Sequence, residues 1–161
     1  MYTDGSMFQE VERTRPRAEE SGCEKSILMV EDDDTIGTFL VLALRQETPC
    51  AVHWVSDGFE ALRAIHEDKP DLLILDYQLP RMNGIDLYDK IHVLPGFEHI
   101  PVIIVSAQLP QREIEKRTLV AISKPFELGE LFNTLDHFLS IPQSTRNNGW
   151  EESGEYDFYS Q

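Results

Sequence analysis

From Ser26 onward, short apolar runs alternate along the chain with longer amphipathic stretches. Five of these runs are four or five residues long, which is typical of parallel strands buried on both faces. The runs are Ile27–Val30, Ala51–Val55, Leu72–Leu75, Val102–Val105 and Leu119–Ile122. We therefore expect five strands, each separated from the next by an amphipathic segment.

The first two amphipathic segments begin with helix-capping residues. Asp33 and Asp34 precede apolar residues at helical spacing, and either carboxylate is a suitable N-cap. Asp57, followed three positions later by Glu60, resembles a capping box ahead of the next apolar stripe. Both segments are predicted to be helices.

The remaining segments are patterned less evenly. Leu87 and Ile91 indicate a third helix, and residues 128–139 carry the strongest helical stripe of the chain. The stretch Pro110–Arg117 has only Ile114 as an obvious apolar anchor, so the fourth helix is the weakest prediction. Strands joined by single helices imply right-handed crossovers and a doubly wound α/β sheet.

Composition fits one folded domain with two polar ends. The 161 residues are 41% hydrophobic, and no apolar run is long enough to span a membrane. We expect one domain over residues 26–140, with disordered ends at 1–25 and 141–161, because neither end has apolar periodicity. No secretory signal is recognisable at the N-terminus, so a cytoplasmic location is expected. The two cysteines of the chain are expected to be free thiols.

The net charge of −15 argues against direct binding of nucleic acid, which depends on Lys and Arg side chains that neutralise phosphates. Residues 26–139 carry 19 acidic and 9 basic side chains, so most of the excess lies in the predicted folded part. Some of these acidic side chains are therefore candidates for a functional site.

Polar side chains follow four of the predicted strands, at the sheet edge where α/β proteins bind ligands. They are Glu31, Asp32 and Asp33 after the first strand, Asp76 after the third, Ser106 after the fourth and Lys124 after the fifth. Carboxylates crowded together repel one another unless they are protonated or bind a cation, and oxygen ligands suit Mg²⁺. The pattern predicts a magnesium site.

Simpler interpretations exist for some of these residues. Helix capping alone is the favoured explanation for Asp33 and Asp34. Lys124 beside a carboxylate is often only an ion pair. Neither explanation covers Asp76, which directly follows the apolar run Leu72–Leu75. Beside a carboxylate that becomes an acyl phosphate, the ammonium of Lys124 and the hydroxyl of Ser106 would stabilise developing charge.

Four runs of sequence carry a resemblance to a known family. They are residues 27–33 (ILMVEDD), 72–84 (LLILDYQLPRMNG), 102–107 (VIIVSA) and 123–126 (SKPF). These runs resemble the signatures of response-regulator receiver domains of two-component systems, in the same order and on the same strands. The resemblance covers about residues 26–140 and implies a flavodoxin-like, five-stranded parallel sheet of order 2-1-3-4-5 with helices on both faces.

The resemblance implies a role for each acidic residue of the site. Asp76 corresponds to the phosphoacceptor, and Glu31 with Asp32 corresponds to the acidic pair that positions Mg²⁺. The ligands of the ion would be Asp32, Asp76 and the backbone carbonyl of Gln78, completed by water and phosphate. Asp33 goes beyond the minimal pair and is a secondary candidate.

Ser106 corresponds to the hydroxyl that binds the phosphoryl group, and Lys124 to the lysine that pairs with it. The family usually has a cis peptide at the position of Lys124–Pro125. Pro80 and Gly84 match the turn and the helix entry that follow the acceptor, which are structural positions.

The chain also departs from the family pattern. Only 18 positions separate Ser106 from Lys124, so a short or irregular fourth helix is expected. The switch aromatic of the family falls on Ala121, which has no ring to swing inward. Gln78 and Gln108 occupy the two positions that tune hydrolysis of the acyl phosphate in the family.

These features favour a stand-alone, chemotaxis-type response regulator. Its partners would be a sensor histidine kinase or phosphotransfer protein and a downstream protein, with no nucleic acid or membrane, and a homodimer is a further hypothesis. The domain would catalyse only its own phosphorylation and dephosphorylation. A receiver-like interaction module that is never phosphorylated is the main alternative. A flavodoxin-like binder or phosphatase ranks lower, because no Gly-rich phosphate loop is present.

Overall fold

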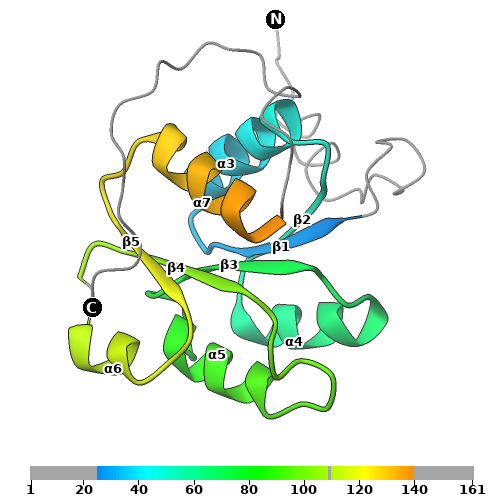
Figure 1. Cartoon of the computed structure of the whole chain (residues 1–161), viewed down its shortest axis with the longest axis vertical. Coiled ribbons are helices and arrows are strands. Elements are labelled where there is room, and N and C mark those ends of the chain that lie inside the picture. Colours follow the sequence, from blue (N-terminus) through cyan, green and yellow to red (C-terminus); the bar gives the residue numbers. More distant parts are fainter. Residues whose placement is uncertain (1–24, 109, 140–161) are drawn as a thin grey trace, which may run out of the picture.

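The computed structural model describes residues 25–108 and 110–139, so the predictions for both chain ends lie outside the described residues. Strands and helices alternate along this part of the chain (Figure 1). The strands are β1 (Ser26–Val30), β2 (Ala51–Val55), β3 (Leu72–Asp76), β4 (Val102–Ser106) and β5 (Val120–Ser123). The helices are α3 (Asp34–Glu47), α4 (Gly58–Glu67), α5 (Gly84–His92), α6 (Gln111–Glu115) and α7 (Leu128–Leu139). None of these helices is long and apolar enough to cross a membrane.

The strands form one parallel sheet in the order β2-β1-β3-β4-β5, which confirms the predicted fold class. Helices α3 and α7 cover one face, and α4, α5 and α6 lie on the other (Figure 1). The strand predictions were wrong by a residue at several ends. Most usefully, β3 and β4 each extend one position further, so that Asp76 and Ser106 are the last residues of their strands.

Two hydrophobic cores, one on each face, explain why the strands are continuous apolar runs. Successive side chains of a strand point to opposite faces. In β1, Ile27 and Met29 therefore enter the core under α3 and α7, while Leu28 and Val30 enter the core under α4 and α5. Full burial of each such side chain stabilises the fold by roughly 1.5–3 kcal/mol.

The predicted caps begin α3 and α4. Asp33 accepts a hydrogen bond from the Ile36 amide at 2.9 Å, and Asp57 accepts one from the Glu60 amide at 2.8 Å. The capping-box prediction needs a correction, because the Glu60 carboxylate accepts from the amide and hydroxyl of Ser56 rather than from the Asp57 amide. The return bond is thus displaced by one residue.

The fourth helix of the described chain, α6, is as short as the sequence predicted. It has five residues, begins at Gln111 without a side-chain cap, and buries none of its residues. One helical turn is not stable by itself. Arg117 holds this segment in place, since its guanidinium donates to Asp89 of α5 at 2.7 Å and to Glu113 at 3.0 Å.

Gly37 is a glycine that close packing requires inside a helix. A Cβ at this position would lie 2.2 Å from an atom of the Trp54 ring, which rests against α3. The ring cannot move away freely, because its Nε1–H donates to the backbone carbonyl of Glu31 at 2.9 Å. Gly129, in α7, has open space at the same position.

We expect Gly37→Ala to lower the free energy of unfolding by about 1–2 kcal/mol, because overpacking against the indole outweighs the better helix propensity of alanine. Gly129→Ala is the matched control and should raise it by roughly 0.5–1 kcal/mol. Urea denaturation of both variants measures the difference. Equal effects of the two substitutions would contradict the packing shown for Gly37.

Candidate functional site

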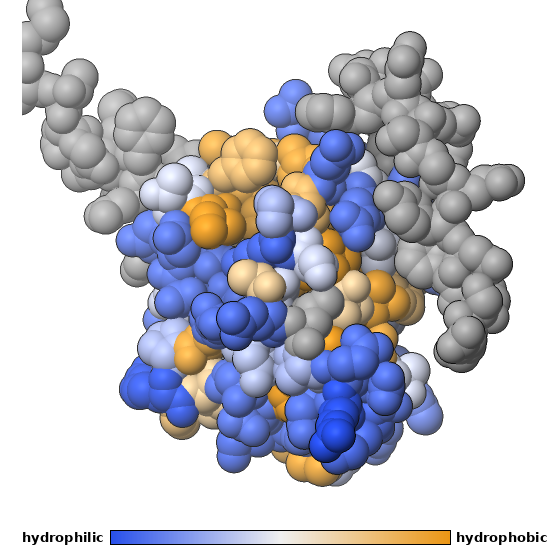
Figure 2. All heavy atoms as spheres, turned by 90° about the vertical axis from the view of Figure 1, so that its left-hand side faces the viewer, coloured by the Kyte–Doolittle hydropathy of each residue, from blue (hydrophilic) through white to orange (hydrophobic). Residues whose placement is uncertain are grey.

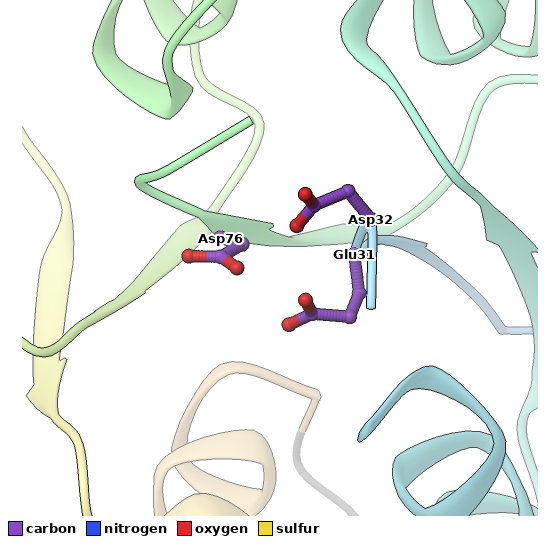
Figure 3. A group of neighbouring side chains, drawn as sticks. All are labelled: Glu31, Asp32 and Asp76. Atoms are coloured by element: carbon purple, nitrogen blue, oxygen red, sulfur yellow. The ribbon is translucent and has the colours of Figure 1, made fainter. Parts of the chain in front are cut away.

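Three carboxylates meet where β1 and β3 end. Glu31 and Asp32 directly follow β1, and Asp76 is the last residue of β3, the strand that pairs with β1. One carboxylate oxygen from each lies within 4.8 Å of the others. Figure 3 shows the side chains of Glu31 and Asp32 extending from one backbone toward the side of Asp76. Glu31 and Asp76 are buried, and Asp32 is exposed.

Lys124 reaches this cluster from the residue directly after β5, a strand that lies two positions from β3 in the sheet. Its Nζ lies 3.2 Å from Asp76 Oδ2 and 3.5 Å from Glu31 Oε2. The lysine amide donates to the Ser106 carbonyl at 2.8 Å, which fixes the backbone from which the side chain extends. The Lys124–Pro125 peptide is cis, as the resemblance implied. One ammonium group thus contacts two buried carboxylates.

Burial and neighbouring charge perturb both partners of this contact. The pKa of Glu31 is raised to about 7, mainly by burial and in addition by the negative charge of Asp76. The Asp33 amide, 3.1 Å from Glu31 Oε1, and the ammonium of Lys124 act in the opposite direction. Burial alone would lower the pKa of Lys124, but Glu31 and Asp76 more than offset it and the pKa is raised.

The environment of Asp76 is built by its own loop. Oδ1 accepts a hydrogen bond from the Gln78 amide at 3.1 Å, so the Gln78 backbone lies next to the Asp76 carboxylate. A Cβ at Gly84 would lie 2.5 Å from the Asp76 carbonyl oxygen, and the Gly84 amide donates to the Tyr77 carbonyl at 2.8 Å. Only glycine allows this close return of the loop.

Ser106 lies at the end of β4 and is buried. Its hydroxyl donates to the Gln108 carbonyl at 2.7 Å and accepts from the Gln108 amide at 3.1 Å. The hydroxyl is therefore engaged within its own turn. Among the described residues it makes no hydrogen bond to Asp76 or Lys124, so the structure places Ser106 on the predicted edge but not in the carboxylate cluster.

Asp33 is better explained as a helix cap than as part of the site. Its carboxylate accepts from the Ile36 amide, and its side chain is exposed outside the group formed by Glu31, Asp32 and Asp76. Asp34 is the first residue of α3 and is also exposed. The capping interpretation favoured from the sequence therefore agrees with the contacts of Asp33, whereas Asp34 lies inside the helix as the acidic residue of its first turn.

One contact of the site has no counterpart in the sequence prediction. Trp54 of β2 donates its indole N–H to the carbonyl of Glu31, and the Glu31 amide donates to the Val55 carbonyl at 3.1 Å. Both peptides that flank Glu31 are thereby hydrogen-bonded to β2. A glycine inside an amphipathic helix, Gly37, was the only signal in the sequence that something large packs there.

The three carboxylates could hold a hard divalent cation. Oxygen ligands suit Mg²⁺, and a single ammonium group leaves the cluster with an excess of negative charge when all three acids are ionised. Lys124 and the cation would both face Asp76. Such an arrangement can stabilise negative charge on a group attached to the Asp76 carboxylate.

A five-stranded parallel sheet that carries an acid pair, a buried aspartate, a hydroxyl and a lysine at one edge defines the receiver class of α/β signalling domains. The family model described as "response regulator receiver domain" matches residues 27–136. The chain therefore belongs to the response-regulator receiver family of two-component signalling.

Curated proteins similar to this chain include response regulators and sensor kinases. The chain is 36% identical over 110 residues to the DNA-binding response regulator MtrA of Mycolicibacterium paratuberculosis, covering 65% of this chain and 47% of the relative. It is 33% identical over 131 residues to the autoinducer 2 sensor kinase/phosphatase LuxQ of Vibrio vulnificus, covering 78% and 15%. The chain thus spans about half of MtrA, and far less of LuxQ.

Solved structures show the same fold. The receiver domain of a sensor histidine kinase from Pseudomonas aeruginosa, described with a magnesium ion coordinated in its active-site cleft, is 25% identical with a TM-score of 0.66, covering 73% of this chain and 99% of that one. The receiver domain of a histidine kinase from Syntrophus aciditrophicus is 28% identical with a TM-score of 0.65, covering 83% and 99%.

Proposed function

We propose that Asp76 accepts a phosphoryl group, in a Mg²⁺-dependent reaction, from a phosphohistidine of a sensor histidine kinase or phosphotransfer protein. The observation that carries this proposal is the position of the Asp76 carboxylate. It is buried at the end of β3, contacts Lys124 at 3.2 Å, and has Glu31 and Asp32 within 4.8 Å.

The transfer is a displacement at phosphorus. An oxygen of Asp76 forms the new P–O bond, the P–N bond to histidine breaks, and the imidazole nitrogen leaves with the electron pair. Lys124 moves its contact from the carboxylate to an oxygen of the phosphoryl group. Ser106 would donate to another phosphoryl oxygen, and to do so its hydroxyl must leave the Gln108 carbonyl. To end the signal, water attacks the same phosphorus, the P–O bond to Asp76 breaks, and phosphate leaves the free carboxylate behind. Gln78 and Gln108 occupy the two positions expected to tune this hydrolysis.

The residues present fit a magnesium ion. Asp32, Asp76 and the backbone carbonyl of Gln78 would ligate it, and Glu31 would balance its charge and orient Asp32. When bound, the ion supplies positive charge that neutralises the phosphoryl oxygens. The magnesium named for the Pseudomonas aeruginosa receiver domain supports this assignment.

We expect acetyl phosphate with Mg²⁺ to label the wild-type protein once, and Asp76→Asn to abolish the label, because an amide cannot form the acyl phosphate. Asp33→Asn is the control, since it removes one nearby charge while asparagine still caps α3. Intact-protein mass spectrometry gives the result. A label that survives Asp76→Asn would refute the assignment, and an unlabelled wild type would favour the receiver-like interaction module.

We expect Mg²⁺ alone to stabilise the protein, because it relieves repulsion among the three carboxylates. Free ion at about ten times its Kd raises the free energy of unfolding by about 1.4 kcal/mol. Asp32→Asn should lose most of this gain, whereas Asp33→Asn should keep it. Thermal melts with and without Mg²⁺ compare the two variants, and equal gains would exclude Asp32 as a ligand.

The output is proposed to be a protein contact made by the side of the domain that carries α6, β5 and α7. Figure 2 views the molecule from the side of β5 and α6 and shows mostly hydrophilic residues below and hydrophobic patches above. The acidic excess of residues 26–139 opposes duplex binding by this domain itself. "DNA-binding" in the name of MtrA describes a relative about twice as long as the matched region.

Phosphorylation is expected to act on this side through the loop after β4, since Ala121 has no ring to move. Beryllofluoride with Mg²⁺, a mimic of the phosphoryl group, should change amide exchange over residues 106–135 as Ser106 exchanges its partner. Asp76→Asn treated in the same way should show no change. Unaltered exchange together with an unaltered sedimentation coefficient would refute this route, and duplex DNA binding at physiological salt would refute the protein-contact output.

A further inference from the structure

The buried indole of Trp54 is bonded to the main chain of the acid pair, although Trp54 has no part in the chemistry proposed above. Its Nε1–H donates to the Glu31 carbonyl at 2.9 Å, and only 9% of the residue is exposed. The side chain comes from β2, the neighbour of β1 at the edge of the sheet. The indole of Trp54 is thus hydrogen-bonded to the backbone of Glu31, directly beside Asp32.

The backbone must leave strand geometry at Glu31 for the acid pair to form one site. Neighbouring side chains of a regular strand point to opposite faces of the sheet. The carboxylates of Glu31 and Asp32 nevertheless both lie within 4.8 Å of an Asp76 oxygen, and β1 ends at the residue before them. The direction of each carboxylate therefore depends on how the peptide between Glu31 and Asp32 is turned.

That peptide is where the indole binds. The Glu31 amide still continues the pairing with β2, through the Val55 carbonyl at 3.1 Å. The Glu31 carbonyl, which belongs to the peptide leading to Asp32, accepts from the Trp54 side chain instead of from another strand. At the position where the chain leaves the sheet, the indole N–H thus supplies the hydrogen bond that a neighbouring strand would otherwise donate.

The helix that follows the acid pair keeps the indole in this position. A Cβ at Gly37 would lie 2.2 and 2.4 Å from two ring atoms, so the ring occupies the space that any other residue would fill. The Gly37 amide donates to the Asp33 carbonyl at 2.8 Å and forms the first turn of α3. Trp54 is therefore wedged between the first turn of α3 and the end of β1.

We propose that Trp54 is a positioning residue for the cation site, whose indole N–H holds the Glu31–Asp32 peptide in the orientation that points both carboxylates at Asp76. The inference rests on the proposed function, because it concerns the same Mg²⁺ site. Removing a group that orients a metal ligand without binding the metal itself commonly lowers the affinity for the metal by about 10–100-fold. The indole acts in this way through the backbone rather than through a ligand side chain.

Trp54→Phe keeps an aromatic ring and removes the N–H. We expect it to weaken Mg²⁺ binding by about ten-fold, measured by isothermal titration calorimetry on the full chain. Tyr88→Phe is the matched control. It also removes one hydrogen bond from a buried aromatic ring to a backbone carbonyl, Tyr88 Oη to Thr118 at 3.3 Å, but at α5 rather than beside the acid pair. Its Mg²⁺ affinity should equal that of the wild type.

A second measurement does not depend on the folding of any substitution at Trp54. In the wild type, the indole N–H resonance of Trp54 should shift during a Mg²⁺ titration and saturate with the Kd of binding. The protein has two tryptophans, and Trp150→Phe identifies the resonance of Trp54 by leaving it in place.

Wild-type binding with an equal affinity in Trp54→Phe would overturn this inference and leave the proposed function standing. An indole resonance that does not respond to saturating Mg²⁺ would do the same. A loss of affinity as large in Tyr88→Phe as in Trp54→Phe would show only general destabilisation and would also overturn it. A wild type that binds no Mg²⁺ would overturn the proposed site and the inference together.

Discussion

Repulsion among three carboxylates at the ends of two adjacent strands is the constraint on which the site depends. The parallel sheet forces the meeting, because β1 and β3 are neighbours and both end at the same edge. Lys124, the Asp33 amide and the Gln78 amide each offset part of the repulsion. The repulsion that remains contributes to the raised pKa of Glu31, which is about 7. Burial is the larger cause of this rise, and the charge of Asp76 adds to it. The two hydrophobic cores, one on each face of the sheet, provide the stability that keeps these acids together.

The fold and the membership of the carboxylate cluster could be predicted from the sequence because both follow from regular rules. Runs such as Leu72–Leu75 are apolar at every position, which identifies strands covered on both faces. Once such strands are parallel, the residues after them must share an edge, and so Glu31, Asp32, Asp76 and Lys124 could be grouped without coordinates. The short α6 was also predictable, because its segment lacks apolar anchors.

Contacts that depend on one particular side chain could not be predicted. Glu60 binds Ser56 rather than the cap residue, and the indole of Trp54 reaches the Glu31 carbonyl across a strand boundary. Arg117 fastens a helix too short to be stable alone through Asp89, a residue 28 positions earlier. No periodicity encodes these contacts. Each depends on where a particular side chain meets a hydrogen-bonding partner in the folded structure.

In the proposed function, the hydroxyl of Ser106 would link the site to the rest of the domain. In this structure both of its hydrogen bonds go to Gln108, so the turn after β4 is closed on itself. Donation to a phosphoryl group would exchange one of these bonds for another, and the turn would then lose the contact that closes it. Ala121, which pairs with Ile104 in the neighbouring strand, offers no ring that could respond to this change. The loop leading into α6 is therefore the segment best placed to respond. Because α6 fully buries none of its residues and Arg117 ties it to Asp89 of α5, we expect a displacement of that loop to alter the surface that α6 presents.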